Sequence, residues 1–199
     1  MINSNDTTEK VWYASYGSNM LKERFMCYIE GGQAAGSNRI NPGCTDKTPP
    51  QRDSPCTINH SLVFAKRSKS WQGGVAFIDP NPTPGAKTLG RMWLITKAQL
   101  IEVMMQECNI QGEVISIDFD EAQRLGSMTI RRGSWYGQLV SLGIKDGAQI
   151  WTMTHCTSLV NEKNGPSKTY AEVIKRGLYE TWGISENSAH IYIIEHSKT

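Results

Sequence analysis

The sequence predicts an α+β domain: a small, mixed, mostly antiparallel and curved β-sheet or barrel, flanked by two to four helices. Three observations predict this class. Short β-branched and aromatic runs recur along the chain. Two or three segments carry apolar residues at helical spacing, and hairpin-type turns separate neighbouring runs. Alternating strand–helix units do not persist through the 199 residues, so a doubly wound fold is not expected.

Composition narrows the class of function. Hydrophobic residues make up 39% and charged residues 20%, which is typical of a globular protein. The net charge of +2 and the scattered basic residues indicate no nucleic-acid partner. No apolar run approaches the ~20 residues that span a bilayer, and the polar start 1–6 does not resemble a secretory signal. We therefore expect no membrane partner and a cytoplasmic location.

The cysteines are odd in number and widely spaced, which predicts reduced thiols rather than a disulfide framework. They are Cys27, Cys44, Cys56, Cys108 and Cys156. Cys44, Cys56 and His60 lie close enough in sequence to be zinc ligands, but a fourth ligand at the usual spacing is missing. His155 and Cys156 are neighbours at the end of a predicted strand, where adjacent side chains point to opposite faces, and this does not suit a nucleophile and its base. No metal site is predicted.

The stretch Tyr16–Asn19 stands at a predicted strand-to-helix turn. The run Val11–Ser15 before it predicts a strand, and Met20–Phe25 after it predicts a short helix. We expect Gly17 to take a backbone conformation closed to other residues, and the serine or asparagine after it to cap the helix. The free N–H groups of such a turn favour a carboxylate or phosphate. A tight turn without a ligand fits the spacing equally well.

Residues 1–10 are expected to fray. Residues 31–57 are rich in Gly, Asn, Pro, Ser and Thr and predict a long irregular loop, a kind of segment that is often functional. Three further strands are predicted, at 60–65, 75–78 and 88–95. A capping box over Thr96–Gln99 then opens a helix that should run to about Glu107.

The C-terminal half contains one clear hairpin. Strands are predicted over 135–142 and 148–154, joined by a turn at 145–147. The runs 114–117 and 127–130 fit either strands or a local excursion. Ser167 should cap a helix that buries Tyr170, Val173 and Ile174 and ends at Gly177. The run 191–194 has strand propensity, although 185–189 fits a helix start as well.

Glu107 is the residue most suited to acid–base chemistry. It ends an amphipathic helix, and its neighbours Met104, Met105 and Cys108 are apolar. A partly buried carboxylate in such surroundings is a candidate general base. A solvated glutamate at a helix end is the alternative interpretation.

Several motifs occur in a defined order. They are Tyr16-Gly17-Ser18-Asn19-Met20 with Arg24 after it, Trp71-Gln72-Gly73-Gly74, Leu89-Gly90-Arg91-Met92-Trp93, the helix ending at Glu107, Trp135-Tyr136, and Pro166-Ser167-Lys168-Thr169-Tyr170. Together they span residues 11–183, nearly the whole chain. In these motifs and their order, the chain resembles the gamma-glutamylcyclotransferase-like family.

The resemblance implies a β-barrel flanked by helices, with no metal or organic cofactor. It implies a reaction in which the α-amine of a γ-glutamyl group attacks its own γ-carbonyl, giving 5-oxoproline and a free amine or amino acid. It assigns Glu107 as the catalytic base, and the partner as a small-molecule γ-glutamyl substrate. The implied substrate-binding residues are Tyr16, Gly17, Ser18, Asn19, Met20, Gly73, Gly74, Tyr136 and Tyr170.

Two features depart from the family pattern. The 31–57 loop is longer than a minimal member needs, and about 109–134 is interpreted as an insertion before Tyr136. Loops of this kind set which leaving group is accepted. One domain over 1–199 is expected, and the oligomeric state stays open, a homodimer included. The alternatives are a non-catalytic or repurposed member that binds a carboxylate ligand, and an amidase or hydrolase on the same scaffold.

Overall fold

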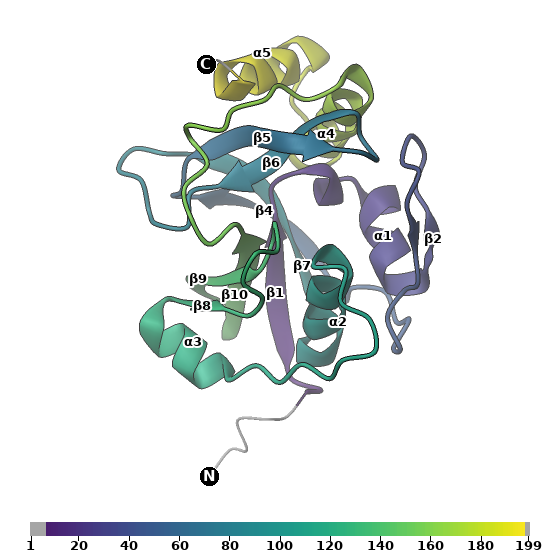
Figure 1. Cartoon of the computed structure of the whole chain (residues 1–199), viewed down its shortest axis with the longest axis vertical. Coiled ribbons are helices and arrows are strands. Elements are labelled where there is room, and N and C mark those ends of the chain that lie inside the picture. Colours follow the sequence, from purple (N-terminus) through teal and green to yellow (C-terminus); the bar gives the residue numbers. More distant parts are fainter. Residues whose placement is uncertain (1–6, 198–199) are drawn as a thin grey trace.

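The computed structural model describes residues 7–197 and is centred on the strand β1 (Lys10–Ser15) (Figure 1). On one side β1 pairs antiparallel with β7 (Thr88–Thr96), and on the other it pairs parallel with β10 (Ala148–Thr154). β1 is therefore interior to the sheet and buried almost throughout. The turn that follows it is held in a fixed position relative to the core.

Three strands complete this sheet. β4 (Asp53–Ile58) pairs with β7, β9 (Gln138–Lys145) pairs with β10, and β8 (Ser127–Thr129) pairs with β9, all antiparallel. The strand order is β4-β7-β1-β10-β9-β8, with β4 and β8 at opposite edges. The α+β class with a mostly antiparallel sheet is confirmed, but the sheet is open and the expected barrel is wrong.

Two short ribbons lie outside the large sheet. β5 (Leu62–Ser68) and β6 (Gly73–Ile78) form a hairpin, and β2 (Gly32–Gln33) pairs with β3 (Ile40–Asn41). β2, β3 and most of β4 lie within 31–57, so that stretch is less irregular than we expected. β4 is an edge strand with alternating exposed residues and one proline, and that composition resembles a loop.

Five α-helices lie within residues 7–197, more than the two to four expected. They are α1 (Lys22–Glu30), α2 (Lys97–Glu107), α3 (Phe119–Leu125), α4 (Lys168–Trp182) and α5 (Glu186–Ser197). α3 and β8 occupy the 109–134 segment, whereas 114–117 forms no strand. Residues 191–194 belong to the helix α5 and not to a strand, so of the two predictions for this segment the helix is confirmed. Ala189 and Ile193 form the buried face of α5.

The helices lie on two sides of the sheet. Figure 1 shows α4 and α5 beside the β5–β6 hairpin, away from α2 and α3. Each side has its own apolar cluster, and β1 contributes to both by strict alternation. Trp12 and Ala14 pack toward α4, while Val11 and Tyr13 pack toward α1 and α2. The sheet is thus covered on both faces.

The start of α2 matches the sequence prediction. Thr96 Oγ1 accepts a hydrogen bond from Gln99 N at 3.0 Å, and Gln99 Oε1 accepts one from Thr96 N at 3.0 Å. This reciprocal box fixes the first turn. The helix ends at Glu107, as predicted.

The start of α4 was also predicted, but its end was not. Ser167 Oγ accepts from Tyr170 N at 3.2 Å, whereas the helix continues through Gly177 to Trp182. A Cβ on Gly177 would lie 2.8 Å from Leu21 N and 2.9 Å from Met20 Cβ. Gly177 is therefore a point of close packing, which lets α4 lie directly against the turn after β1.

The remaining boundaries differ from the predictions by a few residues. The strand expected from 60 begins at Leu62, and the strand expected from 135 begins at Gln138. Of the residues expected to fray, 1–6 lie outside the described part, whereas the Glu9 carbonyl accepts from Lys97 N at 2.9 Å.

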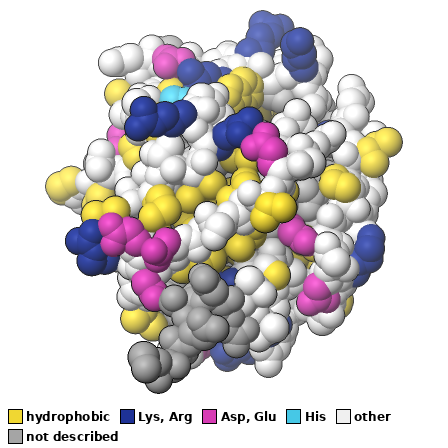
Figure 2. All heavy atoms as spheres, turned by 60° about the horizontal axis from the view of Figure 1, so that its bottom comes forward, with side chains coloured by type: hydrophobic (Ala, Val, Ile, Leu, Met, Phe, Trp, Pro, Cys, Tyr) yellow, Lys and Arg dark blue, Asp and Glu magenta, His cyan; other side chains and the backbone are white. Residues whose placement is uncertain are grey.

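Among residues 7–197, the helices fall short of the length and apolar character that a membrane crossing requires. Figure 2 shows basic side chains in separate groups among acidic ones on one face.

Candidate active site

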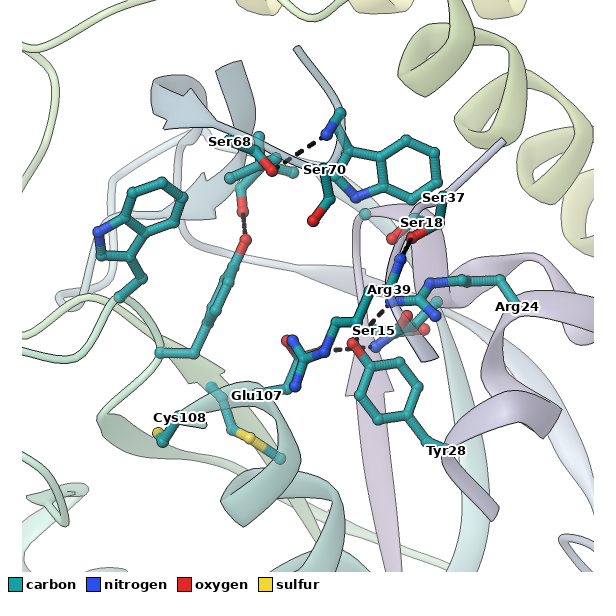
Figure 3. Close-up of a pocket in the computed structure, with 18 of the residues that line it drawn as sticks. Ser15, Ser18, Arg24, Tyr28, Ser37, Arg39, Ser68, Ser70, Glu107 and Cys108 are labelled. Carbon is teal, nitrogen blue, oxygen red and sulfur yellow. Dashed lines mark hydrogen bonds between the residues drawn. The ribbon is translucent and has the colours of Figure 1, made fainter. Parts of the chain in front are cut away.

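A cavity of about 350 Å³ opens where the end of β1, the turn after it, α1 and the C-terminal end of α2 meet (Figure 3). Its volume is in the range of small-molecule sites. Seven of the residues expected from the sequence line it: Tyr16, Gly17, Ser18, Asn19, Glu107, Tyr136 and Tyr170. These residues come from distant parts of the chain, and the fold brings them to one place.

The turn after β1 is built differently from what we expected. Ser18–Met20 form one turn of 3-10 helix, and α1 begins after Leu21 with no side-chain cap. Gly17 has φ −121° and ψ −140°, which lie outside the helical and extended regions. Glycine also provides space, since a Cβ would lie 3.0 Å from Tyr170 Oη and 3.1 Å from Ala76 Cβ. The expected side-chain cap is wrong.

Glu107 is joined to this turn by a direct hydrogen bond. Its Oε1 accepts from Asn19 Nδ2 at 2.9 Å, across 88 residues of sequence. The same Nδ2 lies 3.3 Å from Tyr13 Oη. Glu107 is half-buried, and no Lys, Arg or His among residues 7–197 forms an ion pair with it. The carboxylate is therefore positioned by a hydrogen bond and has no basic partner among these residues.

Five tyrosines surround the carboxylate: Tyr13, Tyr16, Tyr28, Tyr136 and Tyr170. Burial raises the pKa of each phenol, and the charge of Glu107 raises each pKa further. All five therefore stay protonated at neutral pH. Three are engaged with backbone: Tyr16 Oη donates to Met153 O at 2.6 Å, Tyr136 Oη donates to Ala76 O at 2.9 Å, and Tyr170 Oη accepts from Ala76 N at 3.2 Å.

Arg24 is a buried cation in the wall of the cavity, only 3% exposed. Its Nη1 donates to Asn41 Oδ1 at 2.9 Å and its Nη2 to Tyr28 Oη at 3.0 Å, and its guanidinium lies 4.7 Å from the Tyr28 ring centre. No carboxylate of residues 7–197 pairs with it. Burial of a charge without a counter-ion is costly, which is the state expected of a site that receives an anion.

Arg39 is a second cation in the wall. It precedes β3, is half-buried, donates its backbone N–H to Ser37 Oγ at 3.2 Å, and donates Nη2 to the carbonyl of Gln106. It also lacks a carboxylate partner within the described residues. Sequence reasoning missed Arg39, because nothing distinguishes it from other basic residues in a polar loop. Arg24 entered only as part of a motif.

Two polar atoms of the cavity wall are buried and lack any hydrogen-bond partner: Asn19 Oδ1 and Arg24 Nε. One is an acceptor beside Glu107, and the other is a donor on a guanidinium. Gln149 Oε1 and Trp151 Nε1 are also unpaired but lie outside the cavity, so what distinguishes Asn19 and Arg24 is their position in its wall, where a ligand can supply the missing partner. An acceptor near a carboxylate suits an ammonium, and a free guanidinium N–H suits a carboxylate. The wall thus fits a zwitterionic ligand.

Three residues expected at the site do not line the cavity. Met20 is fully buried in the core. Gly73 and Gly74 pack against the backbone of 164–167, where Gly74 N donates to Gly165 O at 2.9 Å. A Cβ on Gly74 would come within 1.7 Å of Asn164 O. These glycines allow two segments to touch, and they are not part of the wall.

The alternative zinc ligands lie in separate surroundings. Cys44 Sγ is near the carbonyls of Tyr28 and Gln99, whereas the His60 ring contacts the carbonyl of Asp79 at 2.7 Å. Cys56 lies on β4 beside β7. In the part of the chain that the structure describes, no three His, Cys, Asp or Glu side chains are grouped so that they could hold a metal ion.

Two solved structures share the fold of this chain. No family model matches the chain. It is 38% identical over 198 aligned positions to "Histone deacetylase 5" of Arabidopsis thaliana, with 92% of this chain covered, but it spans only 30% of that relative's length. A solved structure titled "Gamma-glutamyl cyclotransferase" superposes with a TM-score of 0.51 at 19% identity, over 92% of this chain and 86% of that one. An uncharacterized protein from Homo sapiens superposes over the same shares with a TM-score of 0.50, also at 19% identity. The chain therefore has the gamma-glutamyl cyclotransferase-like fold.

Proposed function

We propose that this chain is a γ-glutamyl cyclotransferase that uses Glu107 as its base. The observation that carries the proposal is the placement of Glu107 Oε1 at 2.9 Å from Asn19 Nδ2, with two unpaired polar atoms in the same wall. A γ-glutamyl group offers the matching ligand. Its α-ammonium suits Glu107 and Asn19 Oδ1, and its α-carboxylate suits the buried Arg24.

The reaction begins with the α-ammonium of the bound glutamyl group. Glu107 removes one proton and leaves a neutral amine. The amine nitrogen then attacks the γ-carbonyl carbon of the same substrate. A carbon–nitrogen bond forms, and a five-membered lactam ring closes. The tyrosines around Glu107 are already protonated at neutral pH, so they do not compete for the proton.

The second half of the reaction breaks the original amide. In becoming a lactam N–H, the former ammonium loses two protons. The leaving nitrogen gains two protons and departs as an ammonium, so no outside acid or base is consumed. Glu107, now protonated, is placed to return its proton to the leaving nitrogen. The products are 5-oxoproline and a free amine or amino acid.

Positioning supplies much of the rate in this scheme. Both reacting atoms belong to one molecule, so the wall needs only to hold the glutamyl group in a curled pose. Two anchors, one for the ammonium and one for the carboxylate, fix its two ends. The close contacts at Gly17 and Gly177 bring Tyr170 and α4 against the turn and keep those anchors in register.

The experiment measures release of 5-oxoproline from a panel of γ-glutamyl amino acids and amines. Glu107→Gln keeps the shape of the side chain but removes the base, and it should lower kcat by about 10²–10⁴-fold. Glu102→Gln is the matched control on the same helix, since Glu102 accepts a hydrogen bond from Thr45 N and does not line the cavity. Wild-type activity in Glu107→Gln would contradict the assignment of the base.

The alternatives give different results in the same assay. A repurposed protein would bind γ-glutamyl compounds without releasing product, and an amidase would release glutamate instead of 5-oxoproline. The deacetylase named in the Arabidopsis relative is not part of the proposal, because the match covers 30% of that protein. A cytoplasmic location and a small-molecule partner remain predictions.

A further inference from the structure

We propose that Arg39 is a specificity residue that binds a carboxylate on the leaving group, so that the enzyme prefers γ-glutamyl amino acids to uncharged γ-glutamyl amides and amines. This inference rests on the proposed cyclotransferase function. It concerns the 31–42 segment, which the catalytic scheme does not use. The segment carries a cation to the cavity, and the scheme gives that cation no role.

The position of Arg39 is fixed by the fold. Asn41, on β3, is 1% exposed and bonds in two directions: Oδ1 accepts from Arg24 Nη1, and Nδ2 donates to Gln106 Oε1 at 3.2 Å. These bonds tie the β2–β3 ribbon to α1 and α2. Arg39 is two residues before Asn41, and its own Nη2 bonds to the Gln106 carbonyl. The guanidinium is thereby held at the residue next to Glu107.

The depth of the two arginines separates their roles. Arg24 is 3% exposed, which suits the glutamyl end of the substrate in the proposed reaction. Arg39 is half-buried and comes from the ribbon at the surface. Figure 3 shows its side chain extending toward Glu107. Arg39 contacts Gln106, the neighbour of Glu107, so in the proposed reaction it is the cation that a substituent on the leaving nitrogen would meet.

The charge of the wall agrees with this division. The charged residues that line the cavity within residues 7–197 are Arg24, Arg39 and Glu107, which leaves one positive charge in excess. A γ-glutamyl amino acid has two carboxylates and one ammonium, and so one negative charge in excess. A γ-glutamyl amine with an uncharged substituent has none. Only the amino-acid class gives each of the three side chains an opposite charge.

The test compares γ-glutamyl-alanine with γ-glutamyl-alaninamide, which differ in the leaving-group carboxylate alone. Wild-type kcat/KM should be about 10- to 100-fold higher for γ-glutamyl-alanine, the size of a charge-assisted contact. Arg39→Gln should bring the ratio of the two values close to one, mainly by slowing γ-glutamyl-alanine, and Arg39→Lys should restore part of it. Both substrates are measured with the same enzyme sample. A variant that contains less folded protein therefore lowers both kcat/KM values equally and leaves their ratio unchanged.

The control is Arg124→Gln, which removes an exposed arginine on α3 outside the cavity wall and should keep the wild-type ratio. Equal wild-type values for the two substrates would overturn the inference, and so would an Arg39→Gln variant that slows both alike. In either case the cyclotransferase itself would stand. Release of 5-oxoproline from neither substrate would overturn the proposed function and the inference together.

Discussion

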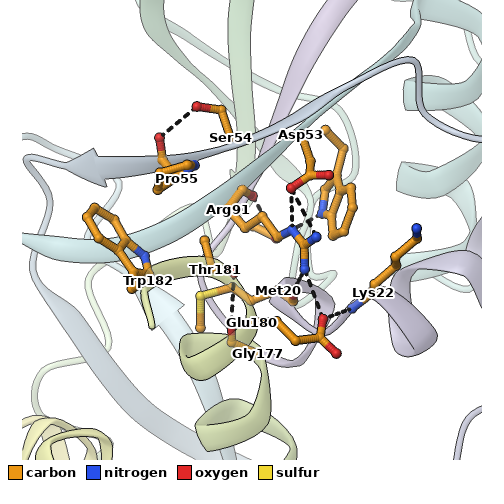
Figure 4. Close-up of polar contacts among 12 residues, drawn as sticks. Met20, Lys22, Asp53, Ser54, Pro55, Arg91, Gly177, Glu180, Thr181 and Trp182 are labelled. Carbon is orange, nitrogen blue, oxygen red and sulfur yellow. Dashed lines mark hydrogen bonds and ion pairs between the residues drawn. The ribbon is translucent and has the colours of Figure 1, made fainter. Parts of the chain in front are cut away.

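Two buried arginines in this molecule have opposite surroundings. Arg91, on β7, is 6% exposed and fully partnered: it pairs with Asp53 and Glu180 at 3.0 Å each and donates to the Met20 carbonyl at 3.0 Å (Figure 4). Arg24 is 3% exposed, has no carboxylate partner among residues 7–197, and keeps one N–H unpaired. Arg91 lies outside the cavity wall and Arg24 lies in it.

The difference shows how the chain separates stability from function. Arg91 joins β4, β7, α4 and the turn after β1, so its charge is used within the fold. Arg24 leaves its charge available, and a ligand carboxylate would complete its surroundings. A buried charge with a partner indicates structure, and one without a partner indicates a site.

For the two arginines, the larger expected effect is that of Arg24→Gln on catalysis. Loss of a buried guanidinium that binds a substrate carboxylate should lower kcat/KM by about 100-fold. The loss should appear mainly in KM, because the contact is made in the ground state as well as in the transition state. Steady-state kinetics with γ-glutamyl-alanine measures it. Unchanged KM would show that Arg24 is not the anion anchor.

The next effect is that of Arg91→Gln on folding. Removal of the cation leaves Asp53 and Glu180 facing each other without it, although both are partly exposed to solvent. The free energy of unfolding should fall by about 2 kcal/mol, less than for a fully buried pair. Urea unfolding measures this loss. A large drop in kcat/KM without loss of stability would contradict the assignment of Arg91 to the fold rather than to the site.

The smallest effect concerns pH and the tyrosines around Glu107. Their pKa values are raised above 10.0 in the folded state by burial and by the charge of Glu107. The folded chain therefore keeps protons that the unfolded chain releases, so stability is fully present below about pH 10 and falls as the pH rises further. Burial is the larger cause and remains in Glu107→Gln, so this variant should lose stability over the same pH range as the wild type. Urea unfolding of both proteins between pH 8 and 11 measures the fall, and a stability that rises with pH over this range would contradict it.

Local signals in the sequence predicted local structure well. The capping box at Thr96 located the start of α2, because it involves residues only three apart, and the poor helix formers of 108–112 located its end at Glu107. β4 was missed because an edge strand can leave alternate side chains in solvent. Its exposed polar residues therefore have the composition of a loop. Gly177 was misread because its role depends on a helix–turn contact that no local pattern encodes.

The candidate site was predictable in part. The turn and Glu107 were connected only through the resemblance to a family, since nothing in the spacing of Asn19 and Glu107 indicates contact. The unpaired state of Arg24 and Arg39 could not be predicted. It depends on which acidic side chains the fold brings near, and the basic residues of this chain look alike in sequence. The structure separates Arg91 from Arg24 by their partners.

The measurement that tests the central claim most directly is the identity of the product. Wild-type protein would be incubated with γ-glutamyl-alanine labelled with ¹³C at the γ-carbonyl, and the labelled product would be followed by NMR. We predict that the label appears in the lactam carbonyl of 5-oxoproline, and that Glu107→Gln abolishes or strongly slows its appearance. Label in the side-chain carboxylate of free glutamate, or no turnover by the wild type, would contradict the account.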